Sequence, residues 1–313
     1  MDLCNRMTSD FELPFTSLEI IYGLVACILS VLIGTVLAKK QARAFSTPKH
    51  KTTNTTAPHP KNLPTVTFVD YGDMRFLHLG TPSVQGSMKL SKPFDIHLEY
   101  VQRMMGWLLF TDLNNVQNLH AMQLGLGAAS LTKFCHHHLD MQTTAIELNP
   151  QVITTCRQWF HLPPDDSKLQ VTIGDAAEAV TQPQWFDKVD VLQIDLYDQE
   201  ADRPVHDSEA FYANCRQLLT PQGCLVVNLF GRHMHFKQSM NKLAQSFGKD
   251  ALWAFKPTPA GNTIVLAFCT PRTQDKQALR LQAQAIEERW PLPATKWLKA
   301  LTPYAMASHD SCT

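Results

Sequence analysis

Two carboxyl side chains follow one apolar segment closely enough to act on the same ligand. The segment Val189–Asp195 ends in an acid, and Asp198 stands three positions further on. Open α/β sheets place their chemistry at the carboxyl ends of their strands, which is where these acids would lie. One carboxylate can then accept a proton while the other holds a cation. The alternative for Asp198 is that it only caps the next helix or loop.

A glycine-rich segment, Gly125-Leu-Gly-Ala-Ala-Ser130, follows an apolar run and precedes a helical pattern. Glycine lets the backbone approach a ligand closely, and the N-terminus of a helix offers unpaired N–H groups. A tight turn without a ligand explains the same glycines equally well. Ser130 replaces the third glycine of a dinucleotide-binding motif, which favours S-adenosylmethionine or a related nucleoside over NAD.

Two further acids are expected near Gly125 and Gly127. Glu147 ends the next predicted strand, about 20 residues after the first glycine, where such folds hydrogen-bond ribose hydroxyls. Asp175 follows Gly174 at the end of the third strand, within reach of an adenine edge. Three strand ends in register favour a nucleoside site over coincidental surface acids.

The elements that position these residues alternate along the chain after Asn118. The predicted strands are Leu119–Gly125, Thr143–Glu147, Leu169–Gly174, Val189–Asp195 and Gly223–Phe230, and the predicted helices are Leu131–Leu139, Pro150–Phe160, Ala176–Val180, Ser208–Leu219 and Gln274–Trp290. Nearly all-apolar strands between helices indicate a parallel sheet covered on both faces. Ala251–Lys256 and Thr263–Cys269 predict a closing antiparallel hairpin. The fold class is therefore α/β.

A smaller β-rich unit precedes this alternation. Thr65–Asp70 and Met74–Leu79 are β-prone segments that predict a hairpin, and His97–Phe110 has apolar residues at helical spacing. The predicted organisation is an N-terminal membrane anchor over residues 1–44, a flexible linker over 45–62, the small β-rich unit with its helix over 63–117, the nucleoside-binding domain over 118–270 and a helical tail over 271–313.

The predicted anchor is the segment Ile20–Ala38, which contains no charged residue. As a helix it would be about 28 Å long, close to the thickness of a bilayer's hydrocarbon core. Acidic residues precede it and basic residues follow it, so the positive-inside rule predicts a single-pass protein of the inner or plasma membrane with a cytoplasmic catalytic domain. The alternatives are a buried core helix or a start codon placed too far upstream.

Composition excludes some functional classes. Lys+Arg and Asp+Glu number 28 each, so no global field attracts the chain to nucleic acid, and no nucleic-acid partner is predicted. His136, His137 and His138 are consecutive; on a helix they point about 100° apart and cannot converge on one ion. No metal is predicted. None of the eight cysteines forms a CxxC pair, which favours free thiols over a disulfide framework or a zinc site.

Taken together, the motifs resemble those of spermidine synthases, and most closely those of the bacterial spermidine synthase-like branch. The matching segments are His78-Leu-Gly80, Gln85-Gly-Ser-Met88, Tyr100-x-x-Arg-Met104, the glycine-rich loop, Ile146-Glu-Leu-Asn-Pro150, Gly174-Asp175, Asp195-x-x-Asp198 and Glu209-Ala-Phe-Tyr212. The resemblance covers about residues 64–270. It implies a Rossmann-like sheet of the class I methyltransferase type, parallel with a terminal antiparallel hairpin and preceded by a small β-rich unit.

The resemblance also implies roles for single residues. Glu147 would bind the ribose and Asp175 the adenine of decarboxylated S-adenosylmethionine, beside the glycine loop. Asp195 would accept the proton, and Asp198 would help to hold the amine acceptor. Gln85, on the cofactor side, and Tyr100, on the substrate side, would line the pocket from the small unit. The family tends to form dimers, which suggests a homodimer.

Two positions depart from the family pattern. The glycine loop of spermidine synthases carries an Asp that contacts the aminopropyl amine of the donor, and Ala128 stands there instead. The proline after Asp-x-x-Asp is replaced by Gln199. We predict a transferase that moves an aminopropyl group from decarboxylated S-adenosylmethionine to a small polyamine. The alternatives are an S-adenosylmethionine-dependent methyltransferase and a non-catalytic nucleoside-binding membrane protein.

Overall fold

The computed structural model describes residues 63–197, 205–230 and 233–304. They belong to one compact unit, Pro58–Thr313. The strands are β1 (Val66–Tyr71), β2 (Met74–Leu79), β3 (Val84–Lys89), β4 (His120–Leu124), β5 (Gln142–Glu147), β6 (Leu169–Ile173), β7 (Val189–Ile194), β8 (Leu219–Phe230), β9 (Leu252–Phe255), β10 (Asn262–Phe268) and β11 (Leu301–Pro303). The α-helices are α2 (Glu99–Arg103), α3 (Ser130–His137), α4 (Pro150–Trp159), α5 (Ala176–Ala179), α6 (Glu209–Leu218), α7 (His233–Phe247), α8 (Lys276–Arg289) and α9 (Ala294–Trp297).

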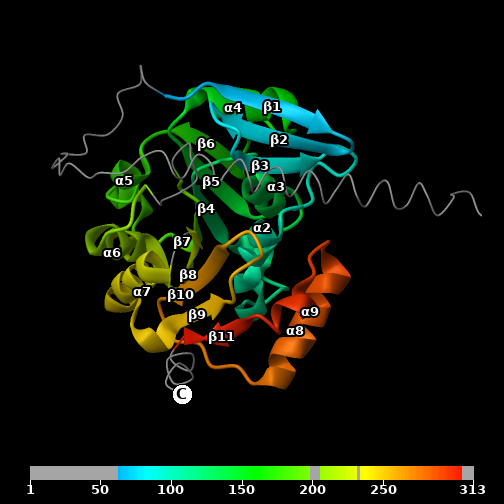
Figure 1. The fold of residues 1–313 in the computed structure, drawn as a ribbon. Coiled ribbons are helices and arrows are strands. Elements are labelled where there is room, and N and C mark those ends of the chain that lie inside the picture. Colours follow the sequence, from blue (N-terminus) through cyan, green and yellow to red (C-terminus); the bar gives the residue numbers. More distant parts are fainter. Residues whose placement is uncertain (1–62, 198–204, 231–232, 305–313) are drawn as a thin grey trace, which may run out of the picture. The chain divides into compact units, whose positions relative to one another are not determined.

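The large sheet has eight strands in the described part of the chain, in the order β11-β9-β10-β8-β7-β4-β5-β6. Strands β4 to β8 run parallel, and β9, β10 and β11 pair antiparallel at one edge. In Figure 1, α5, α6 and α7 lie on one side of this sheet and α2, α8 and α9 on the other. The predicted α/β fold, with a parallel sheet and a terminal antiparallel hairpin, is confirmed.

Alternating side chains of the strands feed two different cores. In β4, Met122 and Leu124 belong to the core that includes α6 and α7, whereas Ala121 belongs to the core that includes α3 and α8. This alternation follows from the period of two in a strand, and it explains why both faces need helices.

A second sheet, in the order β1-β2-β3, forms the small unit near the N-terminal side of the described chain (Figure 1). Leu77 and Met88 of this sheet share a buried cluster with Ala128 of the glycine loop and Val152 of α4. The small sheet therefore packs directly against the loop that follows β4.

The structure differs from the sequence-based expectations in a few elements. His97–Phe110 is not one helix, because α2 ends at Arg103 and a 3₁₀ helix spans Gly106–Phe110. A Cβ at Gly106 would lie 2.9 Å from the ring of Phe255, so the first residue of this 3₁₀ helix has no room for a side chain. The strands β3 and β11 and the helix α7 were not predicted.

The predicted membrane association is corrected. No helix among the described residues is long and apolar enough to cross a membrane. The longest of them, α7, has 15 residues and spans about 22 Å, shorter than the roughly 30 Å of a hydrocarbon core. The segment Ile20–Ala38 lies outside the described residues. The predicted membrane partner and the predicted inner-membrane location are therefore withdrawn.

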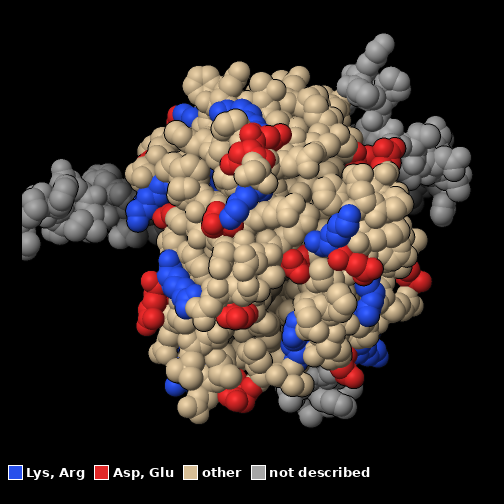
Figure 2. All heavy atoms as spheres, turned by 180° about the vertical axis from the view of Figure 1, so that it is seen from behind, with Lys and Arg blue, Asp and Glu red and all other residues tan. Residues whose placement is uncertain are grey.

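Charged side chains are mixed on the surface. On the face that Figure 2 shows, Lys and Arg stand among Asp and Glu, and neither sign gathers into a large patch. This pattern agrees with the equal numbers of basic and acidic residues. It gives no reason to expect a nucleic-acid partner.

Candidate active site

The glycine loop begins where β4 ends, and its backbone has an unusual conformation. Gly125, Gly127 and Ala129 all have positive φ, at 85°, 51° and 58°. A Cβ at Gly125 would lie 2.6 Å from the carbonyl oxygen of Asp195, and one at Gly127 would lie 3.0 Å from that of Gln85. The two glycines are therefore needed for the close approach of neighbouring chain segments, whether or not a ligand is bound.

Glu147, the last residue of β5, holds this loop in place. Its Oε2 accepts a hydrogen bond from the backbone N–H of Leu126 at 2.8 Å, and its Oε1 accepts one from that of Asn149 at 2.8 Å. Burial raises the pKa of the Glu147 carboxyl, and these N–H donors act in the opposite direction. The carboxylate thus lies at the carboxyl end of β5, beside the loop.

Asp175 follows β6 and forms the N-cap of α5. Its Oδ1 accepts a hydrogen bond from the backbone N–H of Ala177 at 2.7 Å and lies 3.5 Å from Nε2 of His206. The His206 ring stacks on Phe211 of α6, with ring centroids 5.1 Å apart. This neighbour of Asp175 was not predicted, because nothing in the sequence connects residue 206 to the end of β6.

Asp195 follows β7 and receives one hydrogen bond on each carboxylate oxygen. The hydroxyl of Tyr100, from α2, donates to Oδ2 at 3.2 Å, and Nδ2 of Asn228, from β8, donates to Oδ1 at 2.9 Å. Burial raises the pKa of the Asp195 carboxyl, and the hydrogen bonds from Asn228 and Tyr100 lower it. Burial, followed by the charge of Asp195, raises the pKa of the Tyr100 hydroxyl well above its usual value.

Three polar residues behind Asp195 were not predicted as part of the site. They are Asn228, Asn262 and Thr258, which are 3%, 9% and 6% exposed. Asn262 donates from Nδ2 to Oδ1 of Asn228 at 3.2 Å. The signal available in the sequence is the single amide of Asn228 within the otherwise apolar run Gly223–Phe230.

Ala128 lies where the family places an acid in the glycine loop, and it is only 3% exposed. A Cβ at Gly86 of β3 would lie 2.7 Å from both the Cβ and the N of Ala128. The small sheet therefore closes over this position, and the loop offers no carboxylate there. Gln85, the predicted pocket residue, stands next to Gly86 on the same strand.

The structure thus brings Gly125, Glu147, Asp175 and Asp195 to the carboxyl ends of four adjacent parallel strands, β4, β5, β6 and β7. Tyr100 joins them through its contact with the last of these acids. Asp198 lies outside the described residues. Among the residues that are described, no group of three or more His, Cys, Asp or Glu side chains is arranged to hold a metal ion.

Comparison with known proteins shows which family the chain resembles. Residues 125–277 match the model of the spermine/spermidine synthase domain. The polyamine aminopropyltransferase of Neisseria meningitidis serogroup A is 31% identical over 246 residues, which cover 78% of this chain and 91% of that protein.

Two solved structures support the fold. The structure of a probable spermidine synthase from Corynebacterium glutamicum has a TM-score of 0.59 at 18% identity, covering 70% of this chain and 83% of that one. The structure of human Methyltransferase-like protein 13 in complex with SAH has a TM-score of 0.56 at 22% identity, and the match covers 62% of this chain and 92% of that one. These likenesses confirm the fold, and the relative at 31% identity confirms the predicted family: the chain belongs to the spermidine synthase family of enzymes.

Proposed function

We propose that this protein transfers an aminopropyl group from decarboxylated S-adenosylmethionine to a small polyamine. The observation that carries the proposal is the carboxylate of Asp195, held at the end of β7 between Tyr100 and Asn228. An amine must be neutral before it can attack, and a carboxylate in a partly dry pocket can take its proton. The family relationship supports the same reaction, since a relative at 31% identity is a polyamine aminopropyltransferase.

In this reaction the amine nitrogen attacks the carbon beside the sulfonium sulfur of the donor. The C–N bond forms as the C–S bond breaks, and the electron pair of the broken bond stays on sulfur, which becomes uncharged. Before this attack, the proton of the ammonium form of the amine passes to Asp195. The protein's contribution is to align the two substrates and to receive that proton.

The remaining site residues have proposed roles in holding the donor. Glu147 would accept hydrogen bonds from the ribose hydroxyls, and Asp175 would accept one from the adenine amine. Glu147 accepts backbone hydrogen bonds at both of its oxygens, and Asp175 accepts one at Oδ1. A carboxylate has about four lone-pair sites, so each can still accept from a ligand. Gln85 and Tyr100 would close the pocket from the side of the small sheet and α2, and Asp198 would hold the acceptor amine.

Ala128 fits this donor less well than the other residues do. A buried ammonium group without a carboxylate partner costs several kcal/mol. Because the side chain of Ala128 packs against Gly86, the loop itself cannot supply that partner. We propose that Asp195 and Asp198 supply the negative charge for both the donor tail and the acceptor.

The same residue favours one second candidate, methyl transfer from intact S-adenosylmethionine. An acid at position 128 would repel the carboxylate of that donor, and Ala128 does not. Calorimetric titration with the two donors separates the candidates. Tighter binding of the decarboxylated donor supports aminopropyl transfer, and tighter binding of the carboxylated donor supports methyl transfer.

The decisive test is turnover. The full chain is incubated with each donor and a panel of diamines and polyamines, and products are identified by mass spectrometry. We expect a mass gain of one aminopropyl group on an amine with the decarboxylated donor, and loss of that product in Asp195→Asn. Transfer of a methyl group in its place, or equal turnover by the variant, contradicts the proposal.

A further inference from the structure

Asp195 stands at the end of a directed chain of hydrogen bonds that starts in the core. The hydroxyl of Thr258 lies 3.4 Å from Oδ1 of Asn262 and also accepts the backbone N–H of Asn262 at 3.1 Å. The hydroxyl of Thr258 thus accepts one hydrogen bond and donates one, to the amide oxygen of Asn262. Asn262 then donates to Asn228, and Asn228 donates to Asp195, at 3.2 and 2.9 Å.

This chain decides which way the Asn228 amide points. An isolated Asn can turn either its oxygen or its NH₂ toward a neighbour. Here Oδ1 of Asn228 is occupied by the NH₂ of Asn262, so the NH₂ of Asn228 must face the carboxylate. The reverse orientation would set two oxygens against each other at Asp195 and two NH₂ groups against each other at Asn262.

The backbone makes the arrangement stiff. Ile194 of β7 pairs with Val227 of β8, so Asp195 and Asn228 follow at the next positions of paired parallel strands. Asn228 pairs in turn with Ile264 of β10, two residues after Asn262. The three side chains therefore come from adjacent strands of one sheet.

Apolar side chains could fill these buried positions without the desolvation penalty of amides. The backbone carbonyl of Asn228 is used separately, since it accepts the hydroxyl of Tyr197 at 2.8 Å. Tyr100 is the titratable side chain that contacts the carboxylate of Asp195 from another element of the described chain. Of these two donors to Asp195, the hydroxyl of Tyr100 can lose its proton, whereas the amide of Asn228 stays uncharged.

We propose that Asn228, oriented by Asn262, is a positioning residue that keeps Asp195 ionised and turns its open lone pairs toward the acceptor amine. The inference rests on the proposed function of Asp195 as the proton acceptor. It extends the site to two buried residues of the sheet, Asn228 and Asn262.

The test measures the titration of Asp195 directly, by ¹³C NMR of its carboxyl group in the full chain. The signal is assigned by its loss in Asp195→Asn. In Asn228→Leu, which removes the donor and keeps the number of side-chain heavy atoms, we expect the pKa of Asp195 to rise by about one to two units. Asn262→Leu frees the Asn228 amide to turn, so we expect a smaller rise in the same direction.

A matched control is Gln193→Leu, which removes a buried amide from the neighbouring strand β7. Gln193 is 1% exposed, and its amide contacts Met104, Met105 and Cys135 rather than the carboxylate of Asp195. We expect the pKa of Asp195 to stay unchanged in this variant. An unchanged pKa in folded Asn228→Leu overturns the proposal; if that variant does not fold, an unchanged pKa in Asn262→Leu does so.

The pH profile of kcat/KM gives a second reading wherever turnover is found. In Asn228→Leu, the acidic limb of this profile should move to higher pH by the same amount as the pKa measured by NMR. If the parent protein transfers nothing to any amine, the proposed function fails, but the NMR titration still decides whether Asn228 controls Asp195. The two proposals can therefore fail separately.

Discussion

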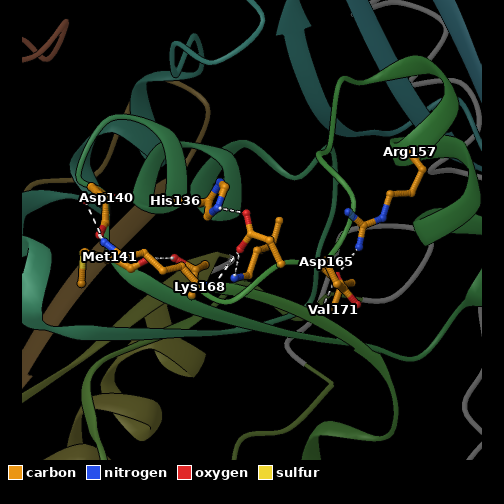
Figure 3. Close-up of polar contacts among 10 residues, drawn as sticks. His136, Asp140, Met141, Arg157, Asp165, Lys168 and Val171 are labelled. Atoms are coloured by element: carbon orange, nitrogen blue, oxygen red, sulfur yellow. Dashed lines mark hydrogen bonds and ion pairs between the residues drawn. The ribbon is translucent and has the colours of Figure 1, made fainter.

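The acids at the carboxyl ends of the parallel strands have different partners from the acids beside the amino ends of β5 and β6. Near the amino ends of β5 and β6, acids are paired with cations, as Figure 3 shows. Nζ of Lys168 lies 2.7 Å from Oδ2 of Asp140, and Arg157 is paired with Asp165. Beside these pairs, a hydrogen bond of 3.0 Å joins Nε2 of His136 to a carboxylate oxygen of Asp166.

At the carboxyl ends the acids have neutral donors. Glu147 is held by backbone N–H groups, and Asp195 by an amide and a phenol hydroxyl. Among the described residues, neither acid is paired with Lys or Arg, and the basic side chain beside Asp175 is that of His206. Neutral donors fix a carboxylate in position without cancelling its charge. The acids beside the amino ends of β5 and β6 are thus closed in ion pairs, whereas Glu147 and Asp195 keep their negative charge.

The largest expected effect is at Asp195. General acid–base catalysis typically contributes about 10²–10⁴-fold, so Asp195→Asn should lower kcat by about 10³-fold while donor affinity changes little. The control is Asp190→Asn at the other end of β7, where the carboxylate accepts hydrogen bonds from the His120 N–H and the Thr220 hydroxyl. Turnover measured by product mass should be nearly unchanged in this control; an equal loss in both variants removes the distinction between the two ends.

Adding an acid to the carboxyl end should also have a large effect. Ala128→Asp places a carboxyl group in an apolar cluster against Gly86, and burying an unpaired charge there should lower the free energy of unfolding by about 3 kcal/mol. Urea denaturation measures the loss, and Ala128→Ser serves as the uncharged control. A fully stable Ala128→Asp with tighter binding of the decarboxylated donor would mean that the loop has room for the family's acid.

Glu147 should govern donor affinity. A hydrogen bond to a charged group is worth about 1.5–3 kcal/mol, so Glu147→Gln should weaken donor binding about 10- to 100-fold in calorimetry. Asp140→Asn, at the opposite end of β5, is the control and should bind the donor as the parent does. If donor affinity is the same in Glu147→Gln, the carboxylate does not bind the donor and serves only to hold the glycine loop through the Leu126 N–H.

The acidic limb of turnover follows from the direction of the Asp195 pKa shift. Burial raises this pKa above its ordinary value, and only the deprotonated carboxyl can accept a proton. Turnover should therefore fall as the pH decreases through this raised pKa, at a higher pH than for an exposed Asp. A profile of kcat/KM without such an acidic limb contradicts the assigned role.

The smallest effect is expected from the ion pairs of the amino end. In the pair between Lys168 and Asp140, the side chains are 41% and 69% exposed, and surface pairs of this kind contribute about 0–1 kcal/mol. Lys168→Met should lower stability by less than about 1 kcal/mol and leave kcat unchanged. A larger loss of turnover than of stability would show that the two ends are coupled.

Much of the fold could be predicted because its strands obey a simple rule. A strand covered on both faces is nearly all apolar, which made β4, β7 and β8 recognisable, and Met74–Leu79 was predicted with its observed bounds. The strand β3 could not be recognised because Val84–Lys89 mixes polar and apolar residues without alternation and contains Gly86. Its strand geometry comes from pairing with β2 and from contact with the glycine loop, and neither is local in the sequence.

The acids of the site could be predicted because each one ends a strand. Their partners could not, because Asn228 and Asn262 lie 33 and 34 residues from the positions they contact. Tyr100 was found only through resemblance to the family, since its contact with Asp195 spans 95 residues. Pairs this distant become visible only after the strand order is known.

The close approach of Gly86 to Ala128 has a consequence for how this chain can change over time. Neither residue can gain a large side chain while the other keeps its present place, so the two positions must vary as a pair. A sequence that acquires an acid in the glycine loop first needs the small sheet to move outward. The order of such substitutions is therefore restricted by the small sheet that covers the loop.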